Sequence, residues 1–174
     1  LAKDNIAFTT FKKQFREHTA RKVYRTIVEG HLRHDMGMID LPIARAKSDF
    51  RKRTVVDMFS QDQRGEEREA ITRYKVLERV TSKDGKQYSY VECYPLTGRT
   101  HQIRAHFRGI RHPIIGDELY GSTKGKDLAP RSMLHAYSIT IEIPCDDAGK
   151  KVETIISEIP KDMNDILKSL GFTV

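Results

Sequence analysis

The feature that most constrains the fold is a strand, a turn and a short helix in immediate succession near the middle of the chain. Residues 88–94 alternate as a half-buried strand does. Thr97 and Gly98 indicate a turn, and Thr97 or Thr100 can cap a helix that runs to about Phe107. The sequence therefore predicts a short helix that starts directly after the end of a strand.

The predicted helix has two distinct faces. Its apolar side chains recur at helical spacing and should face the core: Ile103, Phe107 and Ile110. A second stripe carries His101, Arg104 and Arg108, and four cationic or imidazole groups fall within eight positions of the chain. Cations at a strand-to-helix junction suit a phosphate or a carboxylate. We therefore expect a binding site here, with an ordinary solvated helix face as the alternative.

The rest of the chain is rich in strands that turn back on themselves. Strands are expected near 21–30, 38–43, 54–59, 69–81, 87–94, 134–143 and 152–156, and helices near 4–18 and 160–171. Asp84 and Gly85 form a strong hairpin signal, and residues 61–68 are charged and expected to be exposed. Because hairpins dominate, we predict an α+β fold with a mainly antiparallel, mixed sheet and a few flanking helices, as one domain over residues 1–174.

The composition restricts the partners and the compartment. The chain has 174 residues, with 31 Lys and Arg against 24 Asp and Glu, for a net charge of +7. A basic balance favours a polyanion such as RNA or DNA. Two cysteines form no disulfide framework, which favours a reducing, cytoplasmic location. No apolar run approaches the roughly 20 residues that span a bilayer, so no membrane partner is expected.

Other chemistries are less well supported by the sequence. His31 with His34, and His101 with His106, lack carboxylates or thiols at zinc-ligand spacing, so no metal site and no metal-dependent nuclease is expected. Cys93 lies within a predicted strand and is interpreted as a small buried hydrophobe. The glycine patterns of the common nucleotide-binding loops do not occur.

An acid–base or nucleophilic site remains, built around Arg104, Tyr24 and a carboxylate. Arg104 cannot act as a base, so its expected role is to orient a carboxylate or a phosphate. Tyr24 lies on the strand predicted at 21–30 and, taken alone, would be interpreted as a core tyrosine.

Several blocks of the sequence resemble the RluA-type RNA pseudouridine synthases. The longest is Leu-Thr-Gly-Arg-Thr-His-Gln-Ile-Arg-Ala-His at residues 96–106. His-Pro-Ile-Ile-Gly-Asp at 112–117 and Tyr-Gly at 120–121 follow it. Residues 22–24 resemble the tyrosine-bearing strand of that family, and residues 134–136 resemble a late motif. The resemblance covers nearly the whole chain and implies a pseudouridine-synthase-like fold.

The resemblance also implies an activity. Members of the family isomerise uridine to pseudouridine in structured RNA, ribosomal or transfer, without a metal or cofactor, and an aspartate is the nucleophile. By match to the motifs, Arg104 would pair with that aspartate and Tyr24 would stack on the target base, which must leave the RNA stack. Basic side chains would hold the RNA, and the candidates are Arg99, His101, Lys124 and Arg131.

One departure from the family pattern affects the expected activity. The His-Arg-Leu-Asp segment that carries the aspartate does not occur in the chain, and Leu1 falls in the strand that would follow it. We therefore expect a catalytic domain truncated at its N-terminus, whose partner is the missing N-terminal segment of the same protein. The chain alone is expected to be inactive, and the alternative is a non-catalytic RNA-binding module on the same fold.

Overall fold

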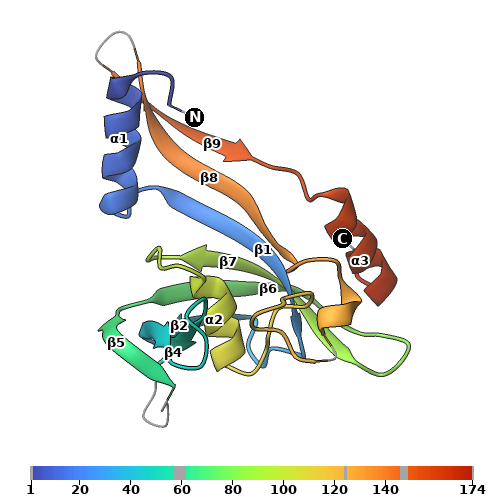
Figure 1. The fold of residues 1–174 in the computed structure, drawn as a ribbon. Helices are drawn as coiled ribbons and strands as arrows, with labels where there is room; N and C mark the ends of the chain where they lie inside the picture. Colours follow the sequence, from blue (N-terminus) through green and yellow to red (C-terminus); the bar gives the residue numbers. More distant parts are fainter. Residues whose placement is uncertain (1, 57–61, 124, 146–148, 174) are drawn as a thin grey trace.

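A six-stranded sheet forms the centre of the molecule in the computed structural model, which describes residues 2–56, 62–123, 125–145 and 149–173 (Figure 1). The strands lie in the order β2-β6-β7-β1-β8-β9, and every neighbouring pair is antiparallel. This confirms the predicted α+β fold with a mainly antiparallel sheet. The strands are β1 Arg21–Glu29, β2 Met36–Asp40, β6 Ile71–Thr81, β7 Gln87–Pro95, β8 Leu134–Pro144 and β9 Lys150–Ile156.

The hairpin between β6 and β7 forms where the turn signal predicts it. Gly85 has a φ of 77°, which a residue without a Cβ adopts easily, and its amide donates to the carbonyl oxygen of Ser82 at 2.9 Å. β7 is then buried on both faces. Cys93 lies opposite Tyr74, whose ring packs against Phe107. Tyr90, three residues from Cys93 and so on the other face, packs against Phe172.

In the part of the chain that the structure describes, three α-helices flank the sheet. Asp4 caps the first by accepting a hydrogen bond from the amide of Ala7 at 2.8 Å, and Gly171 ends the last with a φ of 95°. Within the described residues, none of the helices is long and apolar enough to cross a membrane. The helices are α1 Asn5–Arg16, α2 Gln102–Gly109 and α3 Lys161–Leu170, with a short 3-10 helix at Lys126–Leu128.

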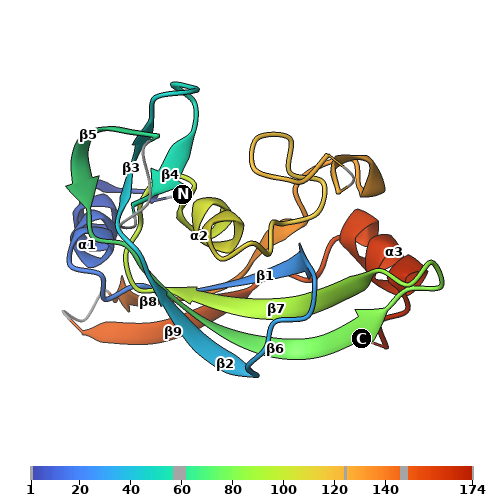
Figure 2. The same cartoon turned by 90° about the horizontal axis from the view of Figure 1, so that it is seen from below.

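A separate three-stranded sheet lies with α2 on one side of the large sheet (Figure 2). Its order is β4-β3-β5, with β3 at Ile43–Ala46, β4 at Arg53–Val55 and β5 at Gln63–Arg68. Gly109 at the end of α2 allows β4 to approach closely, because a Cβ there would lie 2.6 Å from a methyl carbon of Val55. The small sheet is therefore packed directly on the helix that carries Arg104.

The structure corrects three expectations about this region. The single strand predicted at 38–43 is two strands, β2 and β3, with Pro42 between them, because proline cannot donate to a ladder. Of the strand predicted at 54–59, residues 54–55 belong to β4, and residues 57–59 lie outside the described part of the chain. Of the charged stretch 61–68, residues 64–68 are exposed as expected, but residues 63–68 form strand β5.

Neither predicted threonine caps α2. The helix begins at Gln102, and His101 occupies the N-cap position in the left-handed region with a φ of 57°. The Thr97 hydroxyl is used elsewhere: it accepts from the amide of Ile71 at 3.0 Å and donates to Oε1 of Gln102 at 2.8 Å. The Gln102 oxygen also accepts from the amide of Arg99, so the turn is held by a buried glutamine.

Candidate active site

A pocket of about 290 Å³ lies where β1, the β7–α2 turn and α2 meet. It brings together four of the residues that the sequence selected: Tyr24, Arg99, His101 and Arg104. Tyr24 belongs to β1 and Arg104 to α2, so the pocket joins elements far apart in the sequence. The complete lining is Lys22, Tyr24, Pro95, Thr97, Gly98, Arg99, His101, Gln102, Ile103, Arg104 and Leu134.

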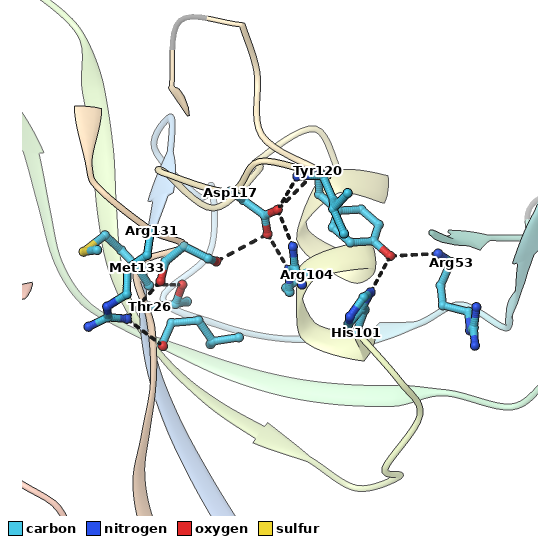
Figure 3. A network of polar contacts seen from close by, with 11 residues as sticks. Thr26, Arg53, His101, Arg104, Asp117, Tyr120, Arg131 and Met133 are labelled. Carbon is cyan, nitrogen blue, oxygen red and sulfur yellow. Dashed lines mark hydrogen bonds and ion pairs between the residues drawn. The ribbon is translucent and has the colours of Figure 1, made fainter. Parts of the chain in front are cut away.

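Arg104 is fixed by a carboxylate within the chain. Its Nε donates to Oδ2 of Asp117 at 2.6 Å and its Nη2 to Oδ1 at 2.7 Å, a bidentate geometry (Figure 3). The Asp117 side chain is fully buried, and that of Arg104 is 19% exposed. This pair raises the pKa of Arg104 further above its ordinary value. Arg104 is therefore a permanently charged group held in one orientation at the pocket wall.

Asp117 is the partner of Arg104 that the sequence did not reveal, because that partner was expected to be an aspartate outside the chain. Its carboxylate also accepts from the amides of Leu119 and Tyr120, each at 3.0 Å. Burial opposes ionisation of Asp117, but the Arg104 and amide hydrogen bonds outweigh it and lower the pKa. Asp117 ends the family-like block at residues 112–117, but its place in that block does not identify a partner thirteen residues away.

Tyr120 joins the pocket to the small sheet. Its hydroxyl accepts from the amide of Arg53 in β4 at 2.7 Å and lies 3.1 Å from Nδ1 of His101 (Figure 3). The guanidinium of Arg104 lies over its ring, 4.9 Å from the centroid. Tyr120 therefore contacts both His101 and Arg104 and fixes β4 beside them.

A buried polar layer anchors α2 to the large sheet. Nε2 of His106 lies 3.0 Å from the carbonyl oxygen of Leu41, which can only accept, so Nε2 carries the proton. Nδ1 then accepts from the Thr72 hydroxyl at 2.9 Å, and that hydroxyl in turn accepts from Nε2 of Gln102. Burial lowers the pKa of His106, which favours this neutral form. The layer sets the position of α2 and hence of Arg104.

Burial also sets the charge of the pocket lining. It raises the pKa of Tyr24 and lowers that of Lys22. The pKa of His101 is lowered by burial first and by Arg104 and Arg53 next. The imidazole of His101 is therefore a neutral hydrogen-bonding group near pH 7. Tyr24 stays a neutral phenol, suited to stacking and hydrogen bonding.

Of the other sequence candidates, Arg131 does not line this pocket. Arg131 forms a bidentate ion pair with Asp162 of α3, at 2.7 and 2.9 Å, and also donates to backbone carbonyl oxygens. Its guanidinium therefore links the loop before β8 to α3. Lys124 lies outside the described residues.

The pocket can orient an anion and accept a flat ring, but the residues that line it include no carboxylate within the described part of the chain. Asp117 does not serve as a nucleophile in this arrangement, because it is fully buried and both its oxygens accept hydrogen bonds. Among the described residues, no three His, Cys, Asp or Glu side chains cluster as metal ligands would.

The fold is that of pseudouridylate synthase domains. The structure is similar to that of human RNA pseudouridylate synthase domain containing 1, with a TM-score of 0.76 and 26% identity over 97% of this chain and 73% of that one. The fold is also similar to that of human RNA pseudouridylate synthase domain containing 4, with a TM-score of 0.68 and 22% identity. These two likenesses define the class of protein to which the fold belongs.

The sequence comparisons place the chain in a family. The model of the RNA pseudouridylate synthase family matches residues 1–108. The dual-specificity RNA pseudouridine synthase RluA of Haemophilus influenzae is 36% identical over 133 residues, which cover 76% of this chain and 56% of the relative. RNA pseudouridine synthase YlyB of Bacillus subtilis is 34% identical over 98% of this chain and 50% of its own length. The chain belongs to the RluA-type RNA pseudouridine synthase family and spans about half the length of such relatives.

Proposed function

We propose that the protein containing this chain isomerises uridine to pseudouridine in structured RNA, ribosomal or transfer, and that the pocket receives the target nucleotide. In this reaction the C1′–N1 bond breaks and a C1′–C5 bond forms, while the proton on C5 leaves and N1 gains one. The observation that carries the proposal is the meeting of Tyr24 and Arg104 in one pocket, since both belong to the family motifs.

The pocket suggests a role for each of the two side chains. Tyr24 stacks on the uracil ring, and because burial raises its pKa it does so as a neutral phenol. Arg104 orients the nucleophilic carboxylate, which an N-terminal segment of the same protein supplies. Its Nε and Nη2 atoms bind Asp117, and Nη1 has no hydrogen-bond partner among the described residues, so it can donate to a second carboxylate.

The remaining candidates and the cellular setting complete the proposal. Arg99 and His101 line the pocket and would contact the nucleotide or its phosphates. We infer weaker roles for Lys124 and Arg131 in holding RNA. We also infer that residues 1–174 are the larger part of one catalytic domain, and that the protein acts in the cytoplasm, where its free cysteines stay reduced.

The test is conversion in cells and in purified protein. Total RNA from a strain that lacks the gene should show one or more uridines where wild-type RNA carries pseudouridine, and the intact protein should restore them. Arg104→Ala in the intact protein should reduce kcat/KM by at least a hundredfold, because the carboxylates beside it would lose their partner. Identical pseudouridine maps in the two strains would contradict the proposal, and full activity of Arg104→Ala would contradict the role of Arg104.

A non-catalytic RNA-binding module is the second candidate. The observation that favours it is the absence of a carboxylate from the pocket lining within the described residues. The two functions separate in one experiment: such a module would bind RNA through Tyr24 and Arg104 and leave uridine unchanged in the intact protein.

A further inference from the structure

Three arginines form a row across the small sheet. In the register of the strands, Arg45 of β3 lies directly opposite Arg53 of β4 on one side and opposite Arg64 of β5 on the other. Directly opposite residues project from the same face of a sheet, and like charges in such pairs destabilise it. We call Arg53, Arg45 and Arg64 the arginine row. Nothing in strand formation favours this arrangement, so its occurrence points to a ligand with negative charge.

The arginine row lines a second pocket, of about 430 Å³. Arg68 and Arg99 also line it, and Glu66 is the single carboxylate in its lining. Glu66 and Arg68 are 3.9 Å apart, with 81% and 64% of their side chains exposed, so this pair neutralises little charge. The complete lining is Ile43, Ala44, Arg45, Arg53, Arg64, Gly65, Glu66, Arg68, Gly98, Arg99 and Thr100.

We call this second pocket the arginine pocket, and the pocket that holds Tyr24 and Arg104 the nucleotide pocket, after its proposed ligand. The two pockets adjoin each other. Gly98 and Arg99 line both. The backbone of Arg53 is also tied to the site, because its amide donates to the Tyr120 hydroxyl that contacts His101. A chain-like ligand whose one unit enters the nucleotide pocket would therefore pass its neighbouring units over the arginine row.

We propose that the arginine row binds phosphate groups of the RNA backbone next to the target nucleotide. The identity of the ligand as RNA rests on the proposed function, whereas the anion site rests on the register and the pocket. Neighbouring strands lie about 4.8 Å apart, so the three guanidinium groups can converge on one or two phosphates. Guanidinium groups bind phosphate oxygens in bidentate fashion and remain charged at any physiological pH.

The experiment measures RNA binding by the chain as a function of salt. Arg45→Gln and Arg64→Gln are compared with Arg73→Gln, which removes the same charge from an exposed strand position on β6. Arg73 is a matched control because its neighbour Thr72 contacts α2, so Arg73 projects from the opposite face of the large sheet. The probe is a short RNA stem-loop with uridines in the loop.

Each row variant should bind this RNA more weakly and reduce the slope of log K against log salt by about 0.7 to 0.9, the value for one lost phosphate contact. The Arg73→Gln control should keep the wild-type slope. Thermal unfolding without RNA should show Tm unchanged or raised in the row variants, because a like-charge contact is removed. A wild-type slope in both row variants, or an equal loss in Arg73→Gln, would overturn the proposal.

The outcome separates this proposal from the proposed function. In the intact protein, the row variants should raise KM for RNA and leave kcat within about twofold. If the intact protein converts no uridine but the row variants still lose a phosphate contact, only the isomerase proposal fails. If conversion is observed and the row variants keep the wild-type KM and salt slope, only the arginine-row proposal fails.

Discussion

The two pockets that share Gly98 and Arg99 use their arginines in opposite ways. In the nucleotide pocket, Arg104 is mostly buried and makes a bidentate pair with a fully buried carboxylate. In the arginine pocket, Arg45 is exposed and faces two other arginines across the sheet. A paired and buried cation maintains a fixed geometry, whereas the like charges of the arginine row repel one another and are stabilised only when an anion binds. We therefore expect the first site to hold a bound group in a fixed position and the second to bind an anion.

The largest expected effect concerns the buried ion pair between Arg104 and Asp117. Asp117→Asn leaves Arg104 without its carboxylate, and removing one partner of a buried pair costs about 3 to 5 kcal/mol. Urea denaturation should show that loss in the free energy of unfolding. Asp162→Asn is the matched control, because its pair with Arg131 is 37% and 41% exposed and should contribute less than about 1 kcal/mol. Equal losses in the two variants would remove the distinction between a buried and a surface pair.

Lowering the pH should decrease the free energy of unfolding through protonation of His106, which anchors α2. Its folded pKa is lowered by burial, so the unfolded chain binds more protons than the folded one as the pH falls below about 6.5. The stabilising contribution of the neutral ring is therefore present above that pH and is lost as the pH falls toward the folded pKa. Urea midpoints measured from pH 8 to about 5 should decline, and His106→Gln should flatten this decline. A pH dependence unchanged by the substitution would exclude His106 as its source.

A smaller effect is expected for the connection between the two pockets. Tyr120→Phe keeps the ring under Arg104 but removes the hydroxyl that accepts from the Arg53 amide. The loss of one such hydrogen bond should lower the free energy of unfolding by about 1 kcal/mol. If the hydroxyl also aligns the two pockets, the affinity of the protein for RNA should fall as well. No change in stability would mean that water replaces the hydroxyl without cost.

The smallest effect has the opposite sign. Arg45→Gln removes the central charge of the arginine row, so the free energy of unfolding should rise by a few tenths of a kcal/mol, about the cost of a like-charge pair across strands. The gain should disappear at high salt, because exposed charges are screened. A loss of stability instead would show that Arg45 supports the sheet rather than a ligand.

The sequence by itself determined the local elements and the family motifs. The turn at Asp84 and Gly85, the cap at Asp4 and the strand at β1 depend on residues only a few positions apart, so their side-chain types and spacing suffice. The motifs also identified Tyr24 and Arg104 as candidates before any geometry was known. The lowering of the pKa of His101 could not be predicted in this way, since it depends on burial and on Arg104 and Arg53.

Only the tertiary structure decided which charged side chains lie next to one another. Asp117 became the partner of Arg104 because the loop after α2 folds back onto that helix, and the arginine row arose because the register of three strands places 45, 53 and 64 side by side. Residue types and periodicity describe each segment separately. Pairing between segments depends on register and packing, which many distant contacts set together. For that reason the arginine row could not be predicted from the sequence alone.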